Sequence, residues 1–270
     1  MSLPVDLKPL EIGQGQVCLE DQSTLRMTIP RKHEGYADAQ FDDYRGRKRK
    51  AFPWSPPVAF RVSARVSDPQ PAGTMGFGFW NDPFSFSLGQ GGARRFPAAP
   101  QTLWFFYGSL PNHLPFAPKI PGHGWKAASL RSPKVPSWLL APAASIGLSL
   151  ALLPLIRRWV IPMGLKLFRA HETLLNVRLD QWHEYSIDWW QDGAQLAVDG
   201  EVVLFVPDPP PAPLGFVAWI DNQFASIHPE QGLRFGTIPT SKSQSLQIRI
   251  LELKKSQDPI KRGRQYPGTA

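Results

Sequence analysis

The segment Trp182–Val203, WHEYSIDWWQDGAQLAVDGEVV, contains the strongest fold signal in the sequence. Runs of aromatic and branched residues, which favour strands, are separated there by the dipeptides Asp192-Gly193 and Asp199-Gly200. An Asp-Gly dipeptide between such runs is typical of a tight β-hairpin turn. The segment therefore predicts three consecutive antiparallel strands, over 184–190, 195–198 and 201–206.

Shorter runs on both sides of this meander have the same character. Residues 58–66 alternate apolar and polar side chains, which predicts a half-buried strand. Gly76 and Gly78 interrupt an aromatic run, where they leave room for the close approach of a ligand or a neighbouring backbone. The high proline content, 29 of 270 residues, disfavours long helices. The other expected strands are 74–82, 102–107, 216–223 and 245–254, and together they predict an all-β antiparallel sandwich.

The composition suits one folded domain. A hydrophobic content of 42% is enough for a sizeable core and excludes wholesale disorder. We expect a single sandwich over 1–255, followed by a solvated basic tail over 256–270. Cys18 is the only cysteine, which excludes a scaffold held by intrachain disulfides. The first residues lack the basic and apolar regions of a secretory signal, so a cytoplasmic location is expected.

The segment Arg45–Lys50, RGRKRK, has two interpretations. Such a run is compatible with a nucleic-acid or localisation patch. However, it follows Asp42 and Asp43 in a proline-rich region, and no nucleic-acid-binding fold accompanies it. We therefore expect a solvated loop and no nucleic-acid partner.

The positive charge is concentrated in the middle of the chain. The net charge is +8, but residues 83–171 contain ten of the thirty Lys and Arg residues and no Asp or Glu. The same region includes an uncharged run over 138–156, WLLAPAASIGLSLALLPLI, and a second apolar patch over 159–168. We expect residues 111–171 to form an apolar, basic and partly helical insertion in the sandwich.

Two arrangements of this insertion remain open. A single membrane crossing would place the two halves of one sandwich on opposite sides, and the second patch is too short to return across a hydrocarbon core of about 30 Å. One arrangement is peripheral contact of residues 131–169 with an anionic membrane surface, with the apolar side chains at the acyl boundary and the cations on the headgroups. The other is a buried helical lid over the domain.

The order of the segments resembles that of the concanavalin A-like lectin/glucanase superfamily, and within it the laminarinase and lichenase type glycoside hydrolases of family sixteen. The resemblance covers about 55–110 and 172–255. Trp182–Val203 is similar to the family's W/F-H-x-Y-x-I-x-W … D-G … V-D-G meander. The segments AFRVSARVSDPQPAGTMGFGFWND (59–82), LGFVAWIDNQ (214–223) and SLQIRILELKK (245–255) resemble its strand pair, its penultimate cleft strand and its closing strand. The resemblance implies a jelly-roll β-sandwich with a concave cleft.

The catalytic strand of that family has no counterpart in this chain. The family's chemistry uses an E-x-D-x-x-E strand with two carboxylates about 5 Å apart. That place is taken here by QTLWFFYGS (101–109), and no carboxylate lies between Asp82 and Glu172. We therefore expect no conventional retaining glycosidase activity.

Two strands repeat a Trp-x-Asp pattern, Trp80-Asn81-Asp82 and Trp219-Ile220-Asp221. Side chains two apart on a strand share a face, so each tryptophan lies beside its aspartate. If both strands belong to the concave sheet, as the resemblance implies, Asp82 and Asp221 could converge as catalytic acid and base. The alternative is that both are turn or cap residues. Expected substrate-binding residues are Trp80, Asn81, Trp104, Phe105, Tyr107, His113, Trp219, Asn222 and Gln223.

No metal or cofactor site is expected. His171-Glu172 and His228-Pro229-Glu230 lack the spaced partners of a zinc site, and the chain has no phosphate-binding glycine loop after a strand.

The leading functional hypothesis is an enzyme acting near a membrane surface. It would bind a hydrophobic or amphipathic, lipid-like small molecule in an aromatic cleft and use the aspartates for hydrolysis, isomerisation or cyclisation. The alternatives are a noncatalytic carbohydrate- or lipid-binding module and a purely structural association with a membrane.

Overall fold

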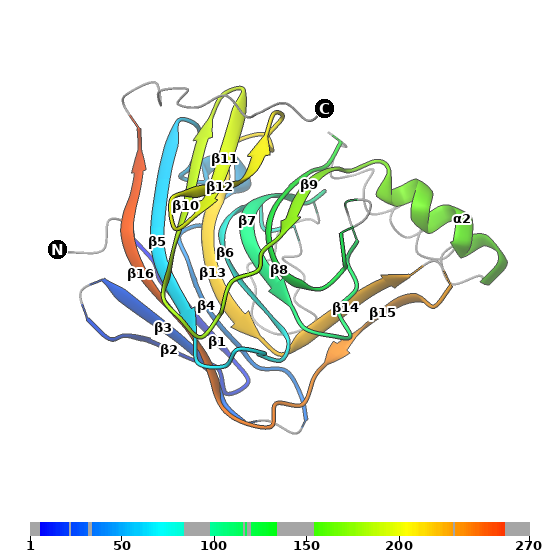
Figure 1. The fold of residues 1–270 in the computed structure, drawn as a ribbon, viewed down its shortest axis with the longest axis horizontal. Helices are drawn as coiled ribbons and strands as arrows, with labels where there is room; N and C mark the ends of the chain where they lie inside the picture. The colour runs from blue at the N-terminus through cyan, green and yellow to red at the C-terminus, as the bar shows by residue number, and fades with distance from the viewer. Residues whose placement is uncertain are drawn as a thin grey trace.

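The computed structural model describes residues 6–21, 23–31, 34–83, 98–115, 117, 120–133, 154–228 and 230–256. Two large antiparallel sheets pack face to face, with the chain passing repeatedly between them (Figure 1). The fold is an all-β antiparallel sandwich, consistent with a jelly roll, as the sequence predicts.

Seven strands form the sheet that positions the candidate site, called sheet A below. In spatial order they are β1 (Lys8–Ile12), β4 (Asp38–Asp42), β13 (Gly215–Asp221), β6 (Thr74–Trp80), β7 (Gln101–Gly108), β8 (Gly124–Arg131) and β9 (Arg169–Leu174).

Sheet B also has seven strands. In spatial order they are β12 (Glu201–Val206), β11 (Gly193–Val198), β10 (His183–Trp190), β5 (Val58–Val66), β16 (Gln244–Lys255), β3 (Thr24–Ile29) and β2 (Gln16–Leu19). Outside the two sheets lie the hairpin of β14 (Gln223–His228) and β15 (Gly232–Thr237), the short 3-10 helix η1 (Arg49–Ala51) and the helix α2 (Pro154–Leu165).

The predicted meander is present as β10, β11 and β12. Asp199 and Gly200 both have positive φ values, 50° and 82°, as a two-residue hairpin turn between twisted strands requires. β10 pairs with β5 along its length, so the meander is joined to the middle of sheet B. The strongest sequence signal therefore forms three of the seven strands of sheet B.

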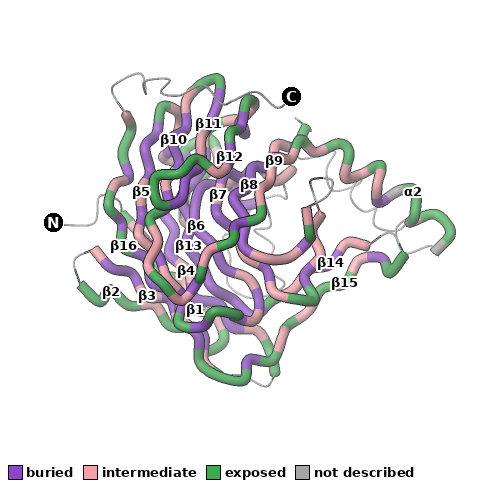
Figure 2. Tube along the Cα trace, in the orientation of Figure 1, coloured by how far each residue is buried: buried purple, intermediate pink, exposed green. Residues whose placement is uncertain are grey.

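The core lies between the facing sides of the two sheets. Phe60 of β5 contacts Phe77 and Phe79 of β6 and Phe216 of β13, with ring centroids 5.4–6.4 Å apart. The buried residues gather on the central strands, and the exposed ones on the edges and on α2 (Figure 2). The side of sheet A turned away from sheet B is called the outer face below.

The structure corrects the expected insertion at 111–171. β8 lies wholly within this range and pairs with β7 on one side and β9 on the other, so part of the range belongs to sheet A itself. Of the uncharged run, residues 138–153 lie outside the described residues. No helix in the described part of the chain is long and apolar enough to cross a membrane.

Candidate functional site

An aromatic patch occupies the outer face of sheet A. It consists of Trp80 on β6, Trp104 and Phe106 on β7, and Trp219 on β13. Their strand neighbours Phe77, Phe79 and Phe105 point the other way, into the core, because successive side chains alternate between faces. Trp219 is buried within the patch, and the other three rings are half-buried.

The four rings form one continuous apolar surface. The indoles of Trp80 and Trp219 are stacked with their planes 7° apart and their centroids 6.4 Å apart. Trp104 lies 5.2 Å from Trp219 and 5.6 Å from Phe106, centroid to centroid. The rings therefore support one another and are held in place by packing.

Two glycines of β6 make room for these rings. A Cβ atom at Gly76 would lie 2.7 Å from Cη2 of Trp219, and one at Gly78 would lie 2.6 Å from the Cβ of Trp104. Gly78 also has a φ of 146°, which favours glycine. The space that the sequence predicts at these positions is thus filled by the neighbouring tryptophans.

A pair of buried aspartates lies at one end of the patch. Asp221 on β13 is directly opposite Asp38 on β4 in the strand register, on the same face as Trp219. Side chains opposite each other in this way have Cβ atoms about 4.5–5.5 Å apart. Asp38 is 4% exposed and Asp221 7% exposed, so the two carboxyl groups are neighbours and both are largely removed from water.

Hydrogen bonding differs sharply between the two carboxyl groups. Oδ1 of Asp221 accepts bonds from the Thr74 backbone N–H (3.2 Å), the Thr74 hydroxyl (2.9 Å) and the Gln223 backbone N–H (3.0 Å). Oδ1 of Asp38 is buried and has no hydrogen-bond partner among the described residues. The Tyr36 hydroxyl is hydrogen-bonded to Asp38, but with one carboxyl oxygen unpartnered and the group buried, the surroundings stabilise the charged form of Asp38 less than that of Asp221.

The pKa values follow this difference. Burial, together with the nearby charge of Asp221, raises the pKa of Asp38 well above its usual value. Burial raises the pKa of Asp221 to about 6, against the opposing hydrogen bonds from Gln223 and Thr74. Burial and these two carboxylates also raise the pKa of Tyr36, whose hydroxyl is hydrogen-bonded to Asp38. The arrangement places two carboxyl groups with raised pKa values side by side.

Thr74 connects this carboxyl pair to the aromatic patch. The Trp219 indole N–H donates to the Thr74 hydroxyl oxygen at 3.1 Å, and the hydroxyl in turn donates to Asp221. A ligand in contact with Trp219 would therefore be linked to Asp221 through the hydroxyl of Thr74.

Asp82 does not join Asp221, and the expected convergence of the two is wrong. β6 and β13 are antiparallel, so Trp80 pairs with Gly215 while Asp221 pairs with Thr74 at the other end of the strands. Asp82 follows β6 with a φ of 47°, and its backbone oxygen accepts a bond from Nη2 of Arg49 at 2.5 Å. It is a turn residue, as the alternative interpretation holds.

Two of the expected aromatic residues lie on the other side of β7. Phe105 is fully buried in the core, and Tyr107 packs against the core, because both alternate with Trp104 and Phe106. Phe106 is the ring on the outer face that the sequence analysis missed.

The expected polar ligand-binding residues have mainly structural contacts. The Asn81 side chain bonds the backbone of Ala99 and Gln101, and the Asn222 side chain bonds the backbone of Gly35, Ala37 and Ile238. These contacts hold loops at opposite ends of the sheet. Gln223 is exposed at the start of β14.

His113 lies in a separate pocket of about 300 Å³ beside the β14–β15 hairpin. Its ring centroid is 5.4 Å from that of His228, and His123 and Arg234 also line the pocket. Burial and the neighbouring His228 lower the pKa of His113. The residue is therefore not part of the aromatic patch.

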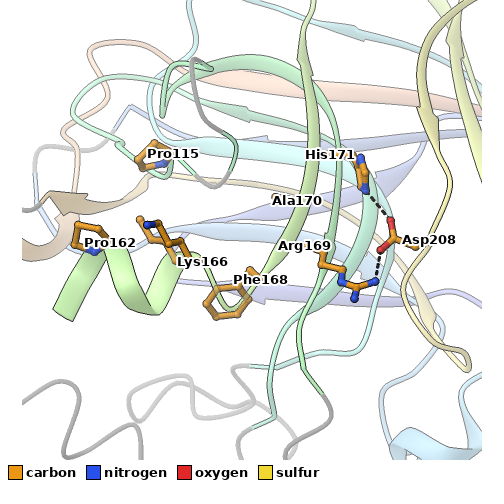
Figure 3. A pocket seen from close by; sticks show the side chains of 9 residues that line it. Pro115, Pro162, Lys166, Phe168, Arg169, Ala170, His171 and Asp208 are labelled. Carbon is orange, nitrogen blue, oxygen red and sulfur yellow. Dashed lines mark hydrogen bonds and ion pairs between the residues drawn. The ribbon is translucent and has the colours of Figure 1, made fainter. Parts of the chain in front are cut away.

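A larger pocket of about 640 Å³ lies between α2 and β9 (Figure 3). Asp208 lies at one side of it and binds both Arg169, at 3.0 Å, and Nε2 of His171, at 2.7 Å. In the part of the chain that the structure describes, no cluster of three or more His, Cys, Asp or Glu residues is arranged to hold a metal ion.

At the expected place of a glycosidase centre, β7 presents Trp104 and Phe106 and no acid. The nearest acid across the sheet is Glu172 on β9, whose Oε2 lies 3.3 Å from Nζ of Lys126 on β8. Both side chains are buried, so this pair occupies the flank of the patch opposite to Asp38.

Asp38 is the functional candidate that the sequence analysis missed. A signal was present: residues 37–42, ADAQFD, alternate small or aromatic residues with Asp38, Gln40 and Asp42. Such alternation predicts a strand with one polar face. The pairing of this strand with β13, however, joins residues 183 positions apart and is visible only in the fold.

The fold and the patch define an antiparallel β-sandwich with an aromatic cluster on the outer face of one sheet. No protein-family model matches the chain, and no curated protein matches it.

Several solved structures have a similar arrangement. An endo-β-1,4-glucuronan lyase from the fungus Trichoderma reesei is 13% identical, with a TM-score of 0.46 over 94% of this chain and 92% of that chain. LamAcat from Zobellia galactanivorans is 11% identical, with a TM-score of 0.44 over 87% and 79% of the two chains. A glycosyl hydrolase family 16 protein from Mycobacterium smegmatis is 10% identical, with a TM-score of 0.42 over 92% and 94%. At these values the likeness carries no argument about chemistry or substrate.

Proposed function

We propose that the chain binds an amphipathic small molecule on the aromatic patch and that Asp221, with Asp38 as its neighbour, exchanges a proton with this ligand. The observation that carries the proposal is the position of the buried carboxyl pair at the Trp219 end of the patch. The protein would then be an enzyme that uses acid and base groups other than those of the family-sixteen glycosidases.

The surroundings of the patch favour an amphipathic ligand over a purely apolar one. Gln40 and Asp42 lie on one flank of the rings, and Lys126 and Glu172 lie on the other. Asp42, Lys126 and Glu172 are already buried and paired, whereas Gln40 is half-buried, so its amide is the polar group of this surface that a ligand could bond. A molecule with an apolar face and polar edges, such as a sugar ring or a glycolipid headgroup, satisfies both parts of the surface.

The raised pKa values of the two aspartates support proton transfer. The pKa of Asp38 is raised well above its usual value, and that of Asp221 is raised to about 6. General acid and base catalysis needs one donor and one acceptor with pKa values near the working pH. Hydrolysis, isomerisation and cyclisation are reactions that such a pair can serve.

A noncatalytic binding module is the second candidate. It is favoured by the deep burial of Asp38 and Asp221, because a ligand must reach a carboxyl group to exchange a proton with it. In that case the four aromatic rings bind the ligand, and Asp38 and Asp221 remain buried without contacting it.

Binding and proton exchange are tested together by calorimetric titration. Octyl glucoside below its micelle concentration, glucose and laminaritetraose serve as probes, each in two buffers with different ionisation enthalpies at pH 6. The proposal expects octyl glucoside to bind more tightly than glucose, with uptake or release of protons on binding. Trp104→Ala should weaken binding about tenfold or more through the loss of ring contact.

Two comparisons decide between the candidates. Asp221→Asn should retain affinity and abolish the proton linkage in an enzyme, whereas a binding module shows no proton linkage in the parent protein. Trp190→Ala, a half-buried tryptophan of sheet B, is the matched control and should bind like the parent. Equal affinity of the parent and Trp104→Ala would remove the patch as the binding site.

A further inference from the structure

The helix α2 exposes its apolar side. Leu155, Trp159 and Met163 are spaced four residues apart and therefore lie along one face of the helix. They are 76%, 69% and 64% exposed, respectively. Ile161, on the opposite face, is buried. A surface helix of a globular protein normally shows the reverse distribution, so this face needs a partner.

Cations accompany the exposed apolar row. Arg158, the residue before Trp159, is exposed, and Lys166, directly after the helix, is also exposed and lines the pocket between α2 and β9 (Figure 3). The sequence from 83 to 171, which contains α2, has no acidic residue. The surface is therefore apolar along its centre and positive at its margins.

The attachment of α2 fixes which side it presents. Arg157 points toward the β14–β15 hairpin and donates from Nη2 to the backbone oxygen of Glu230. Figure 1 shows α2 projecting from the edge of the sandwich beyond β9, with β15 passing below it. The helix is thus held through its inner face, and its exposed row is turned away from the body of the protein.

The described length of this helix is shorter than a membrane crossing. Twelve residues at 1.5 Å each give a length of about 18 Å, against a hydrocarbon core of about 30 Å. A helix of this length can lie in the plane of the headgroups with its apolar row in the acyl boundary.

We propose that the exposed face of α2 binds the surface of an anionic lipid bilayer. Charge decides between this occupant and a second copy of the chain. Two copies meeting through α2 would bring their cations together without an acid from either helix. An anionic headgroup layer attracts the same cations, and the acyl boundary beneath it can hold the apolar side chains of the row. The proposal is independent of any ligand on the aromatic patch.

Co-sedimentation of the full chain with vesicles tests the proposal. Vesicles of phosphatidylcholine alone are compared with vesicles containing 30 mol% phosphatidylglycerol, at about 0.1 M and 0.5 M salt. Binding should be stronger to the anionic vesicles and weaker at high salt, because exposed charges are screened. Trp159→Ser should weaken binding about tenfold or more, and Lys166→Gln about fivefold.

Matched controls keep the test specific. Leu251→Ser removes an exposed apolar side chain from sheet B, and Lys255→Gln removes an exposed cation from the end of the same strand. Both should bind like the parent. The proposal is overturned if Trp159→Ser binds like its control, if neutral and anionic vesicles bind equally, or if sedimentation shows a dimer that Trp159→Ser dissociates.

Discussion

Asp221 receives hydrogen bonds on one carboxylate oxygen from Thr74 and Gln223. Asparagine retains this oxygen as a carbonyl acceptor, so Asp221→Asn removes the charge while keeping these contacts. The substitution therefore separates the effect of the Asp221 charge on stability from the effect of its hydrogen bonds.

We expect the pH dependence of stability to change in Asp221→Asn. The pKa of Asp221 is raised from 3.8 to about 6 in the folded protein, so the folded state holds the proton more tightly than the unfolded state. The resulting stabilisation is complete below pH 4 and is lost as the pH rises through 6. A shift of this size corresponds to at most about 3 kcal/mol. Urea unfolding between pH 4 and 8 should show this fall in the parent and a flatter profile in the variant.

The half-buried Asp180 provides the control for this measurement. It pairs with Arg178 at the surface, so Asp180→Asn should leave the pH profile close to that of the parent. A profile for Asp221→Asn that parallels the parent from pH 4 to 8 would contradict the assignment. Asp43 contributes in the same direction, since burial raises its pKa to about 7.

The buried pair Lys126–Glu172 leads to a second prediction at this scale. Lys126→Met leaves Glu172 buried without its cation, which should cost about 3–5 kcal/mol of unfolding free energy at pH 8. Burial already raises the pKa of Glu172, so its protonation should recover part of the loss at pH 5. Denaturation at both pH values measures the difference. In the double variant with Glu172→Leu, most of the stability should return, and an equal loss in both variants would argue against the pair.

Among the elements, β6 shows how one strand shapes the site. Trp80 comes from β6 itself, and the glycines two and four residues before it lie under rings that come from β7 and β13. Trp104 of β7 and Trp219 of β13 can approach each other across β6 because β6 has no side chains at Gly76 and Gly78. The patch is thus a property of three adjacent strands.

Gly76→Ala should disturb both stability and the patch. Its new Cβ would meet Trp219 at 2.7 Å and the Phe105 backbone oxygen at 2.4 Å, so the ring has to move. Overpacking of this kind costs about 1–3 kcal/mol, and near-ultraviolet circular dichroism should report the displaced indole. Gly164→Ala has open space around the new atom and serves as the control. An unchanged spectrum in Gly76→Ala would mean that Trp219 is not held against β6.

The sequence predicts these elements well where local patterns determine them. The Asp-Gly turns and the alternation in β5 lead directly to sheet B. β8 was missed because GWKAASLR has neither alternation nor branched residues, and its burial comes from the strands on either side. The pairing of Asp38 with Asp221 was missed for a related reason. The register between strands that are distant in sequence depends on the pairing of the whole sheet. A Trp-x-Asp repeat indicates that the two side chains share a face of the sheet, but it does not indicate which residues of the neighbouring strand lie opposite them.

At the scale of the molecule, the sandwich should not act as a β-glucanase. Residues 83–171 contain no acid, and β7, which the sequence resemblance aligns with the family's catalytic strand, has aromatic side chains and no carboxylate. Purified protein incubated with laminarin or lichenan should release no reducing sugar above the blank, with a laminarinase as positive control. Heat-labile release of sugar would show that other acids of the sheet perform this hydrolysis.

The position of β16 has a consequence for how the molecule is made. This strand is the last of the sandwich in chain order, yet it lies between β5 and β3 in the middle of sheet B. During synthesis, β3 and β5 emerge early and wait with unpaired edges until β16 has left the ribosome. Sheet B can therefore be completed only after β16 has been synthesised, and the edges of β3 and β5 that it joins stay open until then.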